Sequence, residues 1–313
     1  MLKSGLSLAA IVVAGVLAAG AATAADYPAS SVRLLVPASP GGSTDVDARV
    51  FAEFFTKHSG AAVAVVNQPA GGGVVAAQTL STGPKDGSVI YLWHAAFHTA
   101  NLFGQSPFSY KDWTPLATVA DYNDVYAVRA DAPYSTIPEL VEYAKAHPNE
   151  VTIGSQFGGT TQVKGEALNG AADKTMRLVD AGGESDRITA LLGEQVDVIS
   201  MSVANAKQYS ESGKMKVLAV INEKADPFAP DWPTTKSQGV DISFPLVFTV
   251  YGPGGMDADA VAAFDAVTAE MKADPAYAEA LQKASQVPDV RNSGETKEFL
   301  DSEFAFVKTL LGK

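Results

Sequence analysis

The sequence contains no cysteine, which excludes a disulfide bond, a thiolate nucleophile, a cysteine zinc site and a lipid attached through sulfur. Histidine is scarce too: the chain has 4, too few to favour a multi-histidine metal site, and we expect no resident metal. The 23 lysines and arginines are outnumbered by 35 acidic residues, so the formal net charge is −12. Nucleic acid is therefore not expected as a partner, because binding to phosphates requires a basic surface.

Charge is also missing from the stretch Ser4–Ala25, which is rich in Ala, Leu, Val and Gly. The stretch follows the positive Lys3 and ends in Ala22-Thr23-Ala24, the small-residue pattern of a signal-peptide cleavage site. We predict that residues 1–25 are a signal peptide and that the mature protein is periplasmic. The alternative for this stretch is a membrane-spanning helix.

The 313-residue chain is long enough for roughly two domains of about 150 residues each. Short apolar runs alternate with segments whose apolar residues follow helical spacing, a pattern typical of an α/β fold with parallel sheets. We predict strands over residues 32–36, 61–66, 89–93, 125–128, 151–155, 176–179, 196–201, 217–221 and 246–251. We predict helices over residues 45–59, 71–81, 137–146, 160–168 and 187–192, and a tail from Asp257 to Lys313 that is helical.

These elements form two α/β units of similar size. Because residues 246–251 have the pattern of a strand that crosses back, we expect one lobe from residues 26–124 and 246–313 and a second from residues 125–245. The expected architecture is two doubly wound sheets joined by crossing strands. Such lobes leave a cleft between them, which is where small ligands bind in open α/β folds.

One glycine-rich loop joins the first predicted strand to the first predicted helix. Glycines let the backbone approach a ligand closely, and a helix start offers unsatisfied N–H groups with a partial positive charge. With its hydroxyl donors, the loop can bind an anion without lysine or arginine; the alternative is a tight turn with a helix cap. It is not a phosphate-binding P-loop, because the lysine of that motif is absent. The candidate binding residues of this loop are Ser39, Pro40, Gly41, Gly42, Ser43, Thr44 and Asp45.

Two further loops have the same strand-to-helix position in the second unit. The first offers Ser155, Gly158, Gly159, Thr160, Thr161 and Gln162, and would face the Ser39–Asp45 loop across the cleft. The second, residues 181–187, contains Gly183 and Arg187, and Arg187 is the one cation near any of these loops. Its Glu184, Asp186 and Arg187 either contact the ligand or form a solvated helix start.

Other patterns give weaker indications. His94 and His98 are four residues apart and could bind zinc from one helix face, but no acidic partner at zinc-protease spacing supports this. The turn at residues 67–73 lacks the GxGxxG pattern of a dinucleotide site, so no cofactor is expected. No Ser-His-Asp order or GxSxG elbow is present, and we predict no catalytic residue. An exported α/β hydrolase remains an alternative.

A series of short motifs is spread along the whole mature chain. They are Tyr27-Pro28, residues 32–37, 40–45 and 67–72, Pro84-Lys85-Asp86-Gly87, residues 112–116, Glu139-Leu140, Tyr143-Ala144-Lys145, Gly154-Ser155, residues 190–197, Gln238-Gly239-Val240 and Gly252-Pro253-Gly254-Gly255. In this order, the motifs resemble those of the Bug family, the periplasmic receptors of tripartite tricarboxylate transporters. The resemblance covers essentially the whole mature chain and does not depend on any single motif.

The resemblance implies a two-lobed Venus-flytrap fold, of the type II kind of periplasmic binding protein, which holds an organic carboxylate in its cleft. In the family, the loops that match Ser39–Asp45 and Ser155–Gln162 hold the ligand from opposite lobes through N–H groups, hydroxyls and water. The implied partners are a small organic carboxylate and the membrane subunits of the transporter, and we expect a monomer. A receptor that signals to a membrane sensor is the alternative role.

The sequence departs from the family pattern at positions that reach the far end of the ligand. The family usually has serine at the position of Gly159 and histidine at that of Gln162. An aromatic-Lys-Gly stretch is common near residues 181–183, whereas this chain offers Glu184, Ser185 and Arg187, and Ser202 adds a hydroxyl. The few arginines near the loops favour a mono- or dicarboxylate over a trianion, and the identity of the ligand stays open.

Overall fold

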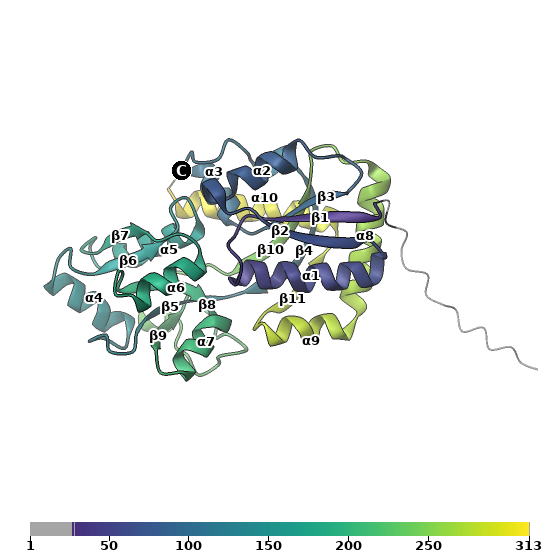
Figure 1. Ribbon diagram of the computed structural model, residues 1–313. Helices are drawn as coiled ribbons and strands as arrows, with labels where there is room; N and C mark the ends of the chain where they lie inside the picture. Colours follow the sequence, from purple (N-terminus) through teal and green to yellow (C-terminus); the bar gives the residue numbers. More distant parts are fainter. Residues whose placement is uncertain (1–26, 28, 313) are drawn as a thin grey trace, which may run out of the picture.

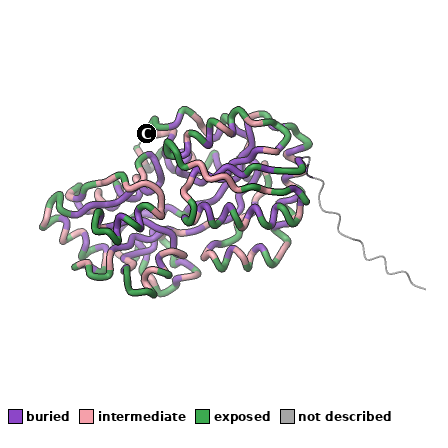
Figure 2. The backbone as a smooth tube through the Cα atoms, viewed as in Figure 1, coloured by how far each residue is buried: buried purple, intermediate pink, exposed green. Residues whose placement is uncertain are grey.

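The computed structural model describes residue 27 and residues 29–312, so the predicted signal peptide lies outside the described part of the chain. The molecule has two lobes, each built around its own mixed β-sheet with helices packed against it (Figure 1). The strands and the helix faces turned toward them are buried, and exposed residues lie on the outer surfaces (Figure 2). Within residues 29–312, no helix has both the length and the apolar character needed to cross a membrane.

The first lobe contains a six-stranded sheet in the order β11-β4-β10-β3-β1-β2. Strands β1, β2 and β3 run parallel, whereas β10 is antiparallel to β3 and β4, and β11 is antiparallel to β4. The strands are β1 (Ser31–Val36), β2 (Ala62–Asn67), β3 (Val89–Trp93), β4 (Thr114–Tyr122), β10 (Leu246–Gly252) and β11 (Val287–Arg291). The helices are α1 (Ser43–Ser59), α2 (Val74–Ser81), α3 (Ala96–Leu102), α8 (Ala258–Ala273), α9 (Pro275–Lys283) and α10 (Ser293–Leu310), with short 3₁₀ turns at Ala70–Gly73 and Tyr110–Asp112.

The second lobe contains a five-stranded sheet in the order β7-β6-β8-β5-β9. Strands β6, β7 and β8 are parallel, and β5 is antiparallel to both of its neighbours. The strands are β5 (Asp124–Arg129), β6 (Thr152–Ser155), β7 (Arg177–Asp180), β8 (Val198–Ser202) and β9 (Met215–Val220). The helices are α4 (Ile137–Ala146), α5 (Thr160–Ala171), α6 (Glu184–Leu192) and α7 (Val203–Glu211), with a 3₁₀ turn at Lys236–Gln238.

The chain passes between the lobes twice. Only Asn123 separates β4 in the first sheet from β5 in the second. The return passes through residues 243–245 to β10, whose Leu246 pairs with Tyr122 at the end of β4. The two crossings therefore lie side by side, and the predicted arrangement of two sheets joined by crossing strands is confirmed.

The tail beyond Asp257 is not helical throughout, because β11 forms within it and pairs with β4. Its sequence Val287-Pro288-Asp289-Val290-Arg291 has no apolar run, since an edge strand is held mainly by backbone hydrogen bonds and one partner strand. The structure also contains three elements that the sequence pattern did not indicate, namely β4, α3 and α7.

Aromatic packing holds helix α1 against the first lobe and so fixes where its N-terminus points. Phe51 and Phe55, one helical turn apart, are fully buried, and their ring centroids lie 5.3 Å from one another. The ring of Phe264 in α8 lies 5.0 Å from that of Phe55. Loss of one such side chain costs about 3–5 kcal/mol of stability. The rigid helix presents its first turn to the other lobe.

Candidate functional site

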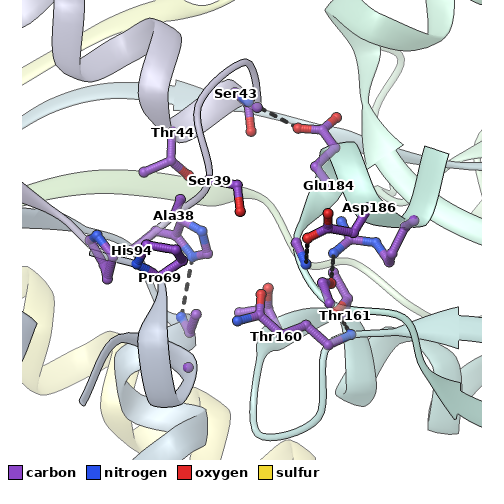
Figure 3. Close-up of a pocket in the computed structure, with 18 of the residues that line it drawn as sticks. Ala38, Ser39, Ser43, Thr44, Pro69, His94, Thr160, Thr161, Glu184 and Asp186 are labelled. Carbon is purple, nitrogen blue, oxygen red and sulfur yellow. Dashed lines mark hydrogen bonds between the residues drawn. The ribbon is translucent and has the colours of Figure 1, made fainter. Parts of the chain in front are cut away.

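A cleft of about 460 Å³ lies between the lobes, where the N-termini of α1, α5 and α6 converge (Figure 3). The structure brings together on its walls, among the residues predicted to bind ligand, Ser39, Gly42, Ser43, Thr44, Thr160, Thr161, Gly183 and Arg187. Polar and aromatic residues that the sequence reasoning did not assign to the cleft also line it: Trp93, His94, Tyr122, Asp124, Gln156 and Asp180.

Asp45 fixes the conformation of the Ser39–Asp45 loop in the first lobe. Its carboxylate accepts hydrogen bonds from Gly41 N (3.0 Å), from the Arg49 guanidinium and from Asn67 Nδ2. Burial raises the pKa of Asp45, but these hydrogen bonds outweigh it and hold the pKa below its usual range. Asp45 is not among the residues that line the cleft, and nor are Pro40 and Gly41. The carboxylate shapes the loop that carries Ser43 and Thr44.

The second-lobe loop is ordered by its own side chains. Gln156 N donates to Thr161 Oγ1 (2.8 Å), Gly158 N donates to Gln162 Oε1 (2.7 Å), and Ser155 Oγ donates to Thr161 O (3.1 Å). Ser155, Gly158, Gly159 and Gln162 do not line the cleft. Thr160 and Thr161, in the first turn of α5, are the predicted residues of this loop that do.

Arg187 is a buried cation in the cleft wall, with 4% of its surface exposed. Its Nε donates to Ser200 O (3.2 Å) and one terminal nitrogen donates to Gly182 O (2.9 Å). A guanidinium has five N–H donors in a planar fork, so these two bonds fix its orientation and leave donors for another acceptor. Arg187 is therefore not part of a solvated helix start.

Glu184, the first residue of α6, joins the two lobes. Its Oε2 accepts a hydrogen bond from Ser43 N at the start of α1 (2.9 Å; Figure 3), and its Oε1 accepts from Ser202 N and Ser202 Oγ (both 2.7 Å). Burial raises the pKa of Glu184, but the N–H groups of Ser43 and Ser202 and the charge of Arg187 outweigh it, so the pKa lies below its usual range. The side chain is a carboxylate at neutral pH.

Ser202 does not line the main cleft. It caps the N-terminus of α7 and lines a separate cavity of about 50 Å³ behind Ser43 and Tyr122. Its hydroxyl donates a hydrogen bond to Glu184, which lines the cleft.

A buried ion pair supports the second-lobe side of the cleft. Lys164 Nζ in α5 lies 2.6 Å from Asp124 Oδ2 at the start of β5, and Asp124 lines the cleft. The same ammonium lies 5.3 Å from the ring centroid of Phe244, in the segment that returns to the first lobe. The pair thus connects the helix that carries Thr160 to the crossing between the lobes.

His94 supplies a neutral imidazole to the first-lobe wall. Burial, followed by the charges of Lys164 and Arg187, lowers its pKa to about 3. Its Nδ1 accepts a hydrogen bond from Ala96 N (3.2 Å), which assigns the proton of the neutral ring to Nε2. His98 has different surroundings, since its Nε2 lies 3.1 Å from Glu303 Oε2 in α10. Within residues 29–312, no group of three His, Asp or Glu side chains is arranged to hold a metal ion.

Comparison with known proteins places this chain in a family. The sequence profile of the tripartite tricarboxylate transporter family receptor matches residues 47–313. The "UPF0065 protein in gbd 5′ region" of Cupriavidus necator is 30% identical over 317 aligned residues, which cover 97% of this chain and 94% of the relative.

Solved structures agree with the fold. The periplasmic binding protein BugD is 26% identical, with a TM-score of 0.80 over 90% of this chain and 97% of BugD. An R. palustris protein solved with adipate has a TM-score of 0.85 over 91% of this chain and 97% of its own; at 23% identity it is evidence for the fold alone.

Proposed function

The chain belongs to the tripartite tricarboxylate transporter receptor family, and on that premise we propose that it binds a small organic carboxylate in the cleft and delivers it to the membrane subunits of its transporter. The family consists of solute-binding receptors rather than enzymes. The resemblance noted in the sequence to the Bug receptors is thereby confirmed at the level of the family.

The observation that carries the proposal is the set of hydrogen-bond donors that line the cleft between the lobes. Arg187 and the first turn of α5 lie on the second-lobe wall, and Ser39 and Thr44 lie on the first-lobe wall. Both helix starts add a partial positive charge, and closure removes the water that would compete for the anion. A planar carboxylate matches the geometry of the Arg187 guanidinium.

A thermal-shift screen of the mature protein tests this proposal. The protein is unfolded and refolded first, to remove any bound ligand, and is then mixed with organic acids and with their primary amides as controls. A ligand at 100 times its Kd adds about 2.7 kcal/mol of stability, which corresponds to a rise in Tm of about 5–10 °C. A rise with particular acids and none with their amides is expected; no rise with any acid would contradict the proposal.

We also propose that the protein reaches the periplasm through cleavage of residues 1–25 and acts as a monomer. Mass spectrometry of the periplasmic protein should give a chain that begins at Asp26, and size-exclusion chromatography with light scattering should give the mass of one chain. A chain that keeps residues 1–25 in the membrane fraction would contradict the first part.

A further inference from the structure

Glu184 places a carboxylate of the protein itself at the start of α1. Ser43 N is the first N–H of that helix, and it is already bonded to Glu184 Oε2 at 2.9 Å. The other oxygen is held within the second lobe by Ser202. The two lobes are close here, because a Cβ built on Gly42 would lie 3.6 Å from the Glu184 Cβ, and Ser185 Oγ lies 3.3 Å from Pro40 O.

The cleft is acidic before any ligand enters. Its walls carry the carboxylates of Asp124, Asp180, Glu184 and Asp186, and Arg187 is the cation among the lining residues. The ammonium of Lys164 pairs with Asp124, at 2.6 Å. His94 adds no charge, because its imidazole is neutral. A ligand with two negative charges would therefore enter a space in which acidic groups already outnumber basic ones.

The hydrogen-bond donors that Glu184 leaves available can bind one carboxylate of the ligand. Arg187 is the charged donor on the second-lobe wall, which Thr160 in the first turn of α5 also lines. The opposite wall offers neutral donors, namely the hydroxyls of Ser39 and Thr44 and the Nε2–H of His94. Neutral donors suit a carbonyl or hydroxyl group of the ligand. A second ligand carboxylate at the start of α1 would have to displace Glu184.

We propose that Glu184 determines ligand specificity: it holds the lobes together as a built-in carboxylate and restricts the ligand to acids with a single negative charge. The inference rests on the proposed function and narrows its substrate class to monocarboxylates. The side chain does two things at once, because it uses the Ser43 N–H that would bind a second carboxylate and repels that group by charge.

The experiment is isothermal titration calorimetry with acid pairs of equal chain length, such as butyrate with succinate and hexanoate with adipate. The measured quantity is the ratio of the two Kd values in each pair. Replacing Glu184 also weakens lobe closure, which lowers the affinity for both members of a pair. The ratio removes this shared effect, so it reports charge selection alone.

Three variants separate the causes. Glu184→Gln removes the charge and keeps the shape, Glu184→Asp keeps the charge on a shorter side chain, and Glu194→Gln removes one charge from an exposed residue just beyond the same helix. We expect the native protein to prefer the monoacid by about tenfold or more, since like charges in close contact are strongly unfavourable. Glu184→Gln should reduce this preference at least about fivefold, whereas the other two variants should keep it.

A native protein that binds the diacids as tightly as the monoacids, or a Glu184→Gln variant with an unchanged ratio, would overturn the inference and leave the proposed function intact. Failure of the native protein to bind any acid, in these pairs or in the thermal screen, would overturn both.

Discussion

Lys164 Nζ and Asp124 Oδ2 lie 2.6 Å apart, and the two side chains are 0% and 5% exposed. The pair joins the helix that begins at Thr160 to the strand that follows the crossing between the lobes. Burial lowers the pKa of Lys164, and Asp124 opposes that effect, so each charge depends on the other.

Replacement of Lys164 by Met should therefore destabilise the protein strongly. The variant leaves the Asp124 carboxylate buried without its cation, which costs about 3–5 kcal/mol. Urea unfolding followed by circular dichroism measures the change. The double variant Lys164→Met/Asp124→Leu should recover much of the loss, because an apolar pair avoids the unpaired charge. Equal losses in the single and double variants would contradict this account.

Asp47 in α1 gives a prediction about pH. The carboxyl is fully buried, neither oxygen has a hydrogen-bond partner among the described residues, and burial raises its pKa well above its usual range. The folded protein thus holds a proton that the unfolded chain loses above about pH 4. Asp47 contributes most to stability below that pH, and the contribution falls by up to about 1.4 kcal/mol per pH unit as the pH rises toward the folded pKa.

Asp47→Asn should therefore make stability less dependent on pH: the unfolding free energy of the variant should rise relative to that of the native protein as the pH increases from about 4 toward the folded pKa of Asp47. The difference in unfolding free energy between variant and native protein isolates Asp47 from the other carboxyls. Asp231→Asn, at an exposed position, is the matched control and should change little. A constant difference between native protein and Asp47→Asn across the pH range would refute the prediction.

Thr99 makes a second contact between the lobes. Its Oγ1 lies 2.6 Å from Gly158 O in the second lobe, and 2.8 Å from Ala96 O in its own helix. Thr99→Val keeps the shape but leaves the Gly158 carbonyl without this donor. The closed form should lose about 0.5–1.5 kcal/mol, which weakens ligand binding by about two- to tenfold.

Small-angle X-ray scattering of the ligand-free variant should show a larger radius of gyration than that of the native protein, and calorimetry should show the weaker binding. Thr79→Val, whose exposed hydroxyl bonds only within α2, is the control. An unchanged radius of gyration together with an unchanged affinity would argue against the contact.

Thr44→Val tests the first-lobe wall directly. Thr44 is buried in the first turn of α1 and lines the cleft. If its hydroxyl bonds to the ligand, the valine variant should bind the best acid of the thermal screen more weakly by about 0.5–3 kcal/mol. Calorimetry measures this, with Thr79→Val again as the control. Unchanged affinity would remove the Thr44 hydroxyl from the site.

The sequence predicted most of the local structure around the cleft. Residues 32–36 and 45–59 became β1 and α1, because apolar periodicity and a glycine loop are properties of neighbouring residues. The same pattern located the start of α5 in the second lobe, whereas α6 begins at Glu184, three residues before the predicted start at Arg187. Strand β11 was not predicted, because residues 287–291 have no strand pattern of their own and form a strand by pairing with β4.

The sequence by itself determined the class of the protein: an acidic α/β chain without cysteine, whose glycine-rich loops lead into helices. Only the tertiary structure determined which residues contact each other in and around the cleft. Glu184 and Ser43 are 141 positions apart, and Lys164 and Asp124 are 40 apart, so no local pattern records their contact. The physical reason is that periodicity reflects burial within one element, whereas contacts between residues far apart in the chain form only when separate elements pack and the two lobes meet.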